Sequence, residues 1–94
     1  MTAKESVAVV TGASQGIGRA TALRLARDFS AVVLAARNEK ELQKTAAVIS
    51  AAGAQPLVCA LDLRESQAAE ILITNTLDRF GRIDALLNIA GAVP

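Results

Sequence analysis

A glycine-rich segment near the start of the chain, Thr11-Gly12-Ala13-Ser14-Gln15-Gly16-Ile17-Gly18, has the composition of a phosphate-binding turn. It lies between an apolar run at 7–10 and a segment of helical periodicity at 16–29. One glycine permits a sharp turn, a second lets the backbone approach a phosphate, and a third allows the helix to pack closely. Because the N-terminus of a helix attracts anions, the segment predicts a pyrophosphate site. The predicted contacts are Gly12, Ser14, Gln15, Gly16, Ile17 and Gly18.

The simpler alternative is that this segment is a glycine-rich turn that only connects a strand to a helix. Its position between the two elements favours phosphate binding over that alternative. The other common phosphate-binding loop ends in Gly-Lys-Ser or Gly-Lys-Thr, and neither tripeptide occurs in the sequence.

Arg37 and Asn38 follow the second apolar run, which spans residues 31–36. An acidic residue at this position would accept a hydrogen bond from an adenosine ribose, whereas a basic residue suits a 2′-phosphate. The guanidinium of Arg37 is planar, permanently charged and matched to phosphate. We therefore predict NADP(H) as the cofactor, with NADPH preferred over NADH. The alternative is that Arg37 is a solvated charge at the start of a helix.

Two further candidate positions follow the third and fourth apolar runs. Asp62, next to Leu63, is placed to accept a hydrogen bond from an adenine amino group, since ligands gather at the carboxyl ends of parallel strands. An ordinary loop aspartate beside a helix N-terminus is an equal alternative. Asn88 interrupts an apolar run, so it either bridges neighbouring strands, which we favour, or forms part of a ligand wall with Ala90 and Gly91.

Four short apolar runs alternate with amphipathic segments along the chain, which predicts a β-α-β-α-β-α-β order. The predicted strands are 7–10, 31–36, 57–61 and 84–90. Apolar strands joined by helical crossovers predict a doubly wound α/β fold, with a Rossmann-like parallel sheet covered on both faces. The expected strand order is 3-2-1-4.

Capping residues and periodicity predict where the helices begin and which faces they bury. Asn38 with Glu41 resembles a capping box, Ser66 is the predicted cap of the third helix, and Gly53 and Gly81 are predicted helix stops. The positions expected to face inward are Gly18, Ala22, Leu25, Ala26 and Phe29 in the first helix, Leu42, Ala46 and Ile49 in the second, and Ala69, Ile73, Leu77 and Phe80 in the third.

The composition disfavours several classes of protein. The sequence contains no His, Tyr or Trp and one cysteine, Cys59, which disfavours a Ser-His-Asp relay, a zinc site or an intramolecular disulfide. A net charge of +1 and two aromatic residues argue against a nucleic-acid partner, and no apolar run is long enough to span a membrane. A cytoplasmic protein is expected, with Cys59 as buried apolar filler.

Several of these motifs together resemble the short-chain dehydrogenase/reductase family. The segment 11–18 looks like its TGxxxGxG cofactor turn, Asp62-Leu63 matches its adenine-contacting pair, and 88–91 resembles its Asn-Asn-Ala-Gly motif. The segment 80–84 is similar to the residues that precede that motif. Ile89 replaces the second Asn, so only backbone contacts carry over there, and Ser30 stands where relatives usually have a helix-ending glycine.

The resemblance implies an oxidoreductase that transfers a hydride between a nicotinamide cofactor and a small carbonyl or alcohol substrate. Residues 1–94 are then expected to form the amino-terminal, dinucleotide-binding part of a single Rossmann-like domain. The catalytic Ser and Tyr-x-x-x-Lys of the family cannot be placed in this sequence, so no catalytic residue is assigned. The fourth strand is expected to leave an apolar edge that recruits a partner, which favours a homo-oligomer. The alternative function is a non-catalytic nucleotide-binding or interaction module that self-associates through this edge.

Overall fold

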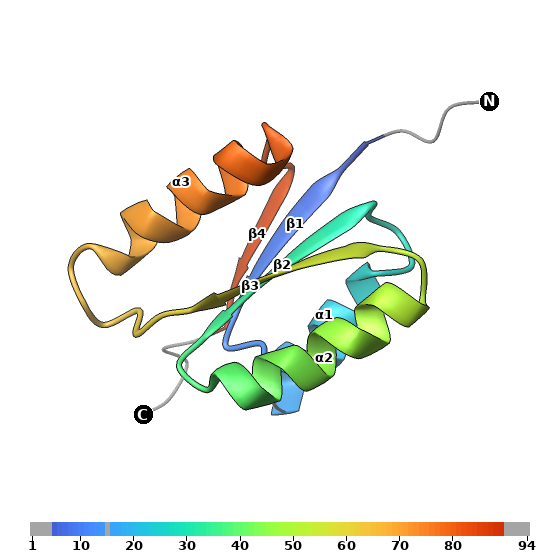
Figure 1. The fold of residues 1–94 in the computed structure, drawn as a ribbon, viewed down its shortest axis with the longest axis horizontal. Coiled ribbons are helices and arrows are strands. Elements are labelled where there is room, and N and C mark those ends of the chain that lie inside the picture. The colour runs from blue at the N-terminus through green and yellow to red at the C-terminus, as the bar shows by residue number, and fades with distance from the viewer. Residues whose placement is uncertain (1–4, 15, 90–94) are drawn as a thin grey trace.

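The computed structural model describes residues 5–14 and 16–89, and its strands and helices alternate along the chain. The elements are β1 (Val7–Thr11), α1 (Gly16–Leu25), β2 (Ala31–Ala36), α2 (Glu39–Ala51), β3 (Gln55–Ala60), α3 (Ala68–Phe80) and β4 (Ala85–Asn88). The strands form one four-stranded sheet with the order β3-β2-β1-β4, in which all neighbours are parallel (Figure 1). The predicted doubly wound, Rossmann-like architecture is therefore confirmed.

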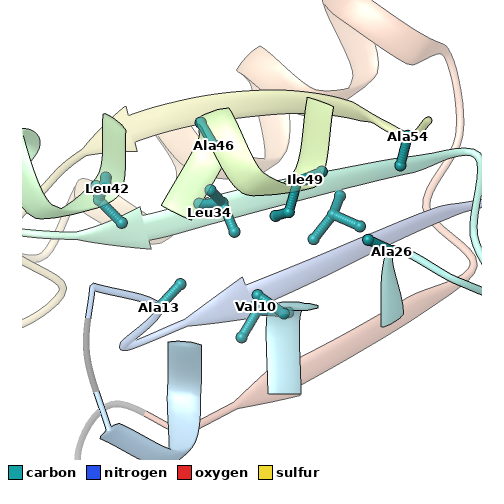
Figure 2. Packing of buried hydrophobic residues seen from close by; sticks show 10 residues of the cluster. Val10, Ala13, Ala26, Leu34, Leu42, Ala46, Ile49 and Ala54 are labelled. Carbon is teal, nitrogen blue, oxygen red and sulfur yellow. The ribbon is translucent and has the colours of Figure 1, made fainter. Parts of the chain in front are cut away.

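The sheet separates two apolar layers. Helices α1 and α2 cover one face, and α3 lies across the other (Figure 1). Figure 2 shows the core beneath α1 and α2, where Val10 and Leu34 of the central strands meet Leu42 and Ile49 of α2. On the opposite face, Val9, Val33 and Cys59 pack in one cluster with Leu72, a buried residue of α3. Successive strand residues thus point to opposite faces.

The two central strands match the prediction of burial on both faces, but the outer strands do not. Every residue of β1 is buried, and so is β2 except for its last residue. In contrast, β4 alternates between half-buried and exposed positions, and Leu86 keeps 54% of its surface exposed. The difference arises because β3 and β4 each pair with one neighbour within the described part of the sheet.

Helix α2 begins and ends as predicted. The side chain of Asn38 accepts a hydrogen bond from the backbone N–H of Glu41 at 3.1 Å, which caps the first turn. At the other end, the N–H of Gly53 donates to Ser50 O and that of Ala54 donates to Ile49 O, the two bonds of a Schellman motif. The predicted inner positions Leu42, Ala46 and Ile49 are buried.

Three predicted boundaries were wrong, because backbone hydrogen bonds set the ends of these elements at other residues. Helix α1 ends at Leu25 rather than near residue 29, since the N–H groups of Arg27 and Asp28 bond to carbonyls three residues back and tighten the last turn. Strand β3 spans Gln55–Ala60 rather than 57–61, because pairing with β2 begins at Gln55 and Pro56 is tolerated on an edge strand. Strand β4 spans Ala85–Asn88 rather than 84–90, of which residue 90 lies outside the described residues.

The predicted start of α3 was wrong, and its predicted inner face was right only in part. Ser66 does not cap the helix, because two successive turns, from Glu65 N–H to Asp62 O and from Ala68 N–H to Glu65 O, occupy the chain before it. The fully inward positions are Ala68, Leu72 and Thr76. Of the predicted positions, Phe80 packs partly buried against the core and Ile73 is half-buried, whereas Ala69 and Leu77 are exposed. The hydroxyl of Thr76 donates to Leu72 O at 2.8 Å, so its burial leaves no unsatisfied polar group.

Side chains close the amino ends of the strands. The Asp84 carboxylate accepts a hydrogen bond from Val7 N–H at 2.8 Å and forms a bidentate pair with Arg82 at 2.7 and 2.9 Å. Ser30 replaces a glycine that is usual in the family, and its hydroxyl donates to Ser6 O at 2.8 Å and accepts from Ser6 N–H at 2.9 Å. These contacts join the segments that enter β1, β2 and β4.

The expectation for Cys59 is met within residues 5–14 and 16–89. Cys59 is a free, buried cysteine, and its burial raises the pKa of the thiol, an effect that a hydrogen bond from Asn75 partly offsets. None of the helices described here has both the length and the apolar character needed to cross a membrane.

Candidate cofactor-binding site

The turn after β1 carries the chain across the end of β2. Gly12 has a φ of +68°, a conformation that glycine adopts without a steric penalty. Its N–H donates to Ala35 O at 2.7 Å, and the N–H of Ala13 donates to the same oxygen at 3.3 Å. The turn is therefore fastened to the end of β2, as required of a rigid support for a ligand.

Gly18 brings α1 against this turn. A Cβ atom at Gly18 would overlap the carbonyl oxygen of Gly12, so any larger residue would push the helix away from the strand end. Gly18 is also buried. This confirms the close packing that the glycine spacing predicted.

The N-terminus of α1 is open with respect to residues 5–14 and 16–89. Apart from its chain neighbours, none of these lies within 4 Å of the position that a Cβ on Gly16 would take, and the Ile17 side chain keeps 76% of its surface exposed. The first N–H groups of any α-helix have no acceptor within the helix, and the first turn of α1 carries no acidic side chain. Together with the helix dipole, this arrangement suits an anionic ligand. Gln15, another predicted contact, lies outside the described residues.

Thr45, a residue that the sequence did not single out, ties this turn to α2. It is fully buried, and its hydroxyl lies 3.4 Å from Ala13 O and 3.3 Å from Glu41 O. The available signal in the sequence was its position, since a threonine there falls on the inner face of the predicted helix with Leu42, Ala46 and Ile49. The contact adds a link from α2 to the bonds that join the glycine turn to β2.

Asn88 bridges two strands at the same end of the sheet. Its side-chain oxygen accepts a hydrogen bond from the Thr11 hydroxyl at 2.8 Å, and that hydroxyl accepts from Ile89 N–H at 2.9 Å. The favoured structural interpretation of Asn88 therefore has a definite partner on β1. The side chain of Ile89 packs against the core beneath α1 and α2, which accounts for an apolar residue at that position of the motif.

Arg37 and Asn38 follow directly after β2. The guanidinium of Arg37 is exposed and makes no hydrogen bond or ion pair within residues 5–14 and 16–89. Asn38 uses its side-chain oxygen to cap α2, so that oxygen is committed to the helix and only the amide NH2 group of Asn38 can donate to a ligand. Arg37 is the residue of the two whose whole polar group remains available.

Asp62, after β3, is engaged by a residue that sequence reasoning missed. Its carboxylate accepts two hydrogen bonds from the Arg64 guanidinium, at 3.0 and 2.9 Å, and a third from Arg64 N–H at 3.0 Å. These bonds lower the pKa of Asp62 from 3.8 to about 2, and the hydrogen bonds from the Arg64 side chain have the largest effect. The signal available in the sequence was the Asp-x-Arg spacing, in which the aspartate closes a local turn.

An apolar groove lies between α3 and β4. Its volume is about 250 Å³, and Leu63, which was predicted to contact the cofactor, lies on its wall beside Asn88. The other lining residues are Thr11, Ala69, Leu72, Ile73 and Leu86. The groove therefore connects the carboxyl end of β4 with the face of α3 that was expected to point inward.

The register of the sheet places the predicted residues on one edge. Thr11 pairs with both Ala35 and Asn88, and Ala36 pairs with Ala60, so the glycine turn, Arg37, Asp62 and Asn88 all follow the same ends of adjacent strands. Ligands of open parallel sheets bind at this edge. Ala90 and Gly91 were predicted to belong to it but lie outside the described residues.

Comparison with known proteins agrees with this geometry. The sequence matches the family described as "short chain dehydrogenase" over residues 6–94. This chain belongs to the short-chain dehydrogenase family. Among curated members, it is 43% identical over 88 residues to the short-chain reductase protein NovJ of Streptomyces niveus, a match that covers 94% of this chain and 34% of that protein.

Solved structures of the short-chain dehydrogenase family share the fold. A metagenomic short-chain oxidoreductase in complex with NADP has a TM-score of 0.80 and 43% identity, with 86% of this chain and 37% of that one covered. An NAD+-bound xylitol dehydrogenase has a TM-score of 0.81 and 34% identity, with 86% and 31% covered. The chain thus spans about a third of the length of its relatives, and those relatives differ in the cofactor they bind.

Proposed function

We propose that this chain is the dinucleotide-binding part of an NADP(H)-dependent oxidoreductase. The whole protein would transfer a hydride between the nicotinamide and a small carbonyl or alcohol substrate. The observation that carries the proposal is the open N-terminus of α1, held against the Gly12 turn by the absence of a side chain at Gly18. Such an arrangement is suited to the pyrophosphate of a dinucleotide.

The residues at the carboxyl edge fit the remaining parts of the cofactor. The Gly16 region would face the pyrophosphate, Arg37 the adenosine ribose, and the Asp62 carboxylate the adenine amino group. Asp62 Oδ1 already accepts two hydrogen bonds from Arg64, but Oδ2 accepts one, so Oδ2 can accept a further donor. When bound, the cofactor supplies the hydride, and these residues orient its adenosine half.

The preference for NADPH over NADH rests on Arg37. The exposed guanidinium of Arg37 makes no hydrogen bond or ion pair within the described residues, so it can form charge-assisted hydrogen bonds to a 2′-phosphate. Relatives bind either NADP or NAD+, so membership of the family does not decide the cofactor. A homo-oligomeric, cytoplasmic enzyme remains part of the proposal.

Titration of the purified chain with NADPH and NADH tests this function. We expect NADPH to bind about tenfold more tightly, and Arg37→Ala to remove most of that difference while changing NADH affinity less than about twofold. Arg27→Ala is the matched control, since Arg27 is an exposed arginine beyond the other end of α1. Equal affinities for the two cofactors, or NADPH binding that is indifferent to Arg37, would contradict the NADP(H) assignment.

A second candidate function is a non-catalytic module that self-associates through β4. The observation in its favour is the apolar groove beside this strand together with Leu86, which is 54% exposed. Edge strands and apolar patches of this kind bind other chains. Light scattering of the chain, with and without Leu86→Glu, tests this candidate: self-association through β4 requires a dimer that the substitution dissociates, and a chain that stays monomeric at all concentrations contradicts it.

A further inference from the structure

The segment after β3 contains a second arginine near the predicted ribose site. β2 and β3 are paired up to Ala36 and Ala60, and Leu61 N–H donates to Ala36 O at 2.9 Å. Arg37 and Asp62 therefore leave the sheet beside one another, and the charge of Arg37 contributes to lowering the pKa of Asp62. Arg64 is bonded to the same carboxylate.

The charges of this cluster depend on Arg64. Asp62 carries a negative charge, pairs directly with the Arg64 guanidinium of its own turn, and follows a strand end adjacent to the one that Arg37 follows. A second acidic residue, Glu65, interacts electrostatically with Arg64. Without Arg64, the two acids would oppose Arg37, and a 2′-phosphate arriving at this edge would be repelled.

The geometry of Arg64 leaves it able to contact a ligand. Two of the five N–H donors of its guanidinium bond to Asp62, so the other donors remain for a second anion. The side chain is 77% exposed and held by a short local turn, in which Asp62 also accepts from Arg64 N–H. The turn fixes the position of the guanidinium, which reduces the entropy lost when a phosphate binds.

We propose that Arg64 is a second specificity-determining residue, which offsets the charge of Asp62 and joins Arg37 in binding the 2′-phosphate of the cofactor. The inference rests on the proposed function, because it concerns the same nucleotide site. It goes beyond that function by assigning the phosphate to two arginines from adjacent strand ends. Arg82 offers a matched comparison, since it pairs with Asp84 through the same type of bidentate contact at the opposite end of the sheet.

Binding of 2′,5′-ADP and 5′-AMP by the chain tests the assignment, because the two ligands differ by the 2′-phosphate alone. We expect Arg64→Ala to weaken binding of 2′,5′-ADP about tenfold and of 5′-AMP less than about twofold. Arg64→Lys, which keeps the charge, should retain most of the affinity for 2′,5′-ADP, and Arg82→Ala should leave the affinities for both ligands unchanged. Circular dichroism of each variant checks that it is folded.

The remaining outcomes overturn the inference. Equal losses for both ligands would mean that Arg64 acts on the adenine site through Asp62, and no loss would mean that it is a solvated partner of Asp62. If Arg37→Ala abolishes the preference for 2′,5′-ADP while Arg64→Ala does not, the proposed function stands and the role of Arg64 is wrong. If the wild-type chain shows no preference, the NADP(H) assignment fails as well.

Discussion

The two ends of the sheet use the same ion-pair chemistry for different purposes. At the amino end, the carboxylate paired with Arg82 also accepts the N–H of Val7, so Asp84 joins β1 to the segment entering β4. At the carboxyl end, Asp62 bonds to the side chain and backbone of Arg64, two residues away. One pair links distant segments, and the other shapes a single turn.

This comparison indicates how to separate structural ion pairs from those available for binding. A carboxylate that satisfies a buried backbone donor contributes to stability, because its removal leaves that donor without a partner. An exposed pair within one turn contributes little to stability. It can therefore exchange or add a partner, as binding of an anionic ligand requires.

The largest effect is expected where the carboxyl end is rigid, at Gly18. Gly18→Val would drive a side chain into the Gly12 carbonyl and should lower the free energy of unfolding by about 3 kcal/mol, as measured by urea denaturation. Gly16→Ala is the matched control: its Cβ meets nothing within 4 Å, and its positive φ should cost about 1 kcal/mol. Similar losses at both positions would show that α1 does not need close contact with the turn.

A smaller effect should distinguish the two aspartates. Asp84→Ala removes the acceptor of Val7 N–H, a residue that is 2% exposed, and should destabilise the fold by about 2 kcal/mol. Asp62→Ala should leave the urea midpoint nearly unchanged, because its partner is exposed. If Asp62→Ala is as destabilising as Asp84→Ala, the contrast between the two ends is wrong.

The smallest effect concerns the titration of Asp62. Its folded pKa of about 2 lies below the ordinary value of 3.8, so the stabilisation from this pair is present above about pH 4 and is lost as the pH falls through about 2. Carboxyl NMR should show this midpoint in the wild type and an upward shift toward 3.8 in Arg64→Ala. Arg82→Ala should not move it, and an unchanged midpoint in Arg64→Ala would refute the pairing.

Much of the fold could be predicted because its signals are local. The Asn38 cap, the stop at Gly53 and the glycine turn each depend on residues within a few positions of one another. The strand order followed from apolar strands alternating with helices, since right-handed crossovers leave few topologies. The carboxyl-edge location of the predicted site followed from the same rule.

The face of α3 and the role of Arg64 could not be predicted in this way. Helix α3 has apolar residues on several sides. Its buried side includes a polar residue, Thr76, whose hydroxyl donates a hydrogen bond within the helix. Periodicity therefore favoured a face that is partly buried at Ile73 and Phe80 but exposed at Ala69 and Leu77. Arg64 had the sequence character of a loop arginine, and the role that we propose for it depends on the pairing of β2 and β3, which places Arg37 and Asp62 after adjacent strand ends.

Local patterns of residue type were enough to predict the order of the elements, the turn after β1 and the residue types available to a dinucleotide. Tertiary structure decided which of those residues keep a free side chain. Asn38 is used by α2, Asn88 bonds to Thr11, and Arg37 remains exposed. The physical reason is that a polar group near a strand end bonds to whatever partner folding brings within reach, and that partner is set by contacts distant in the sequence.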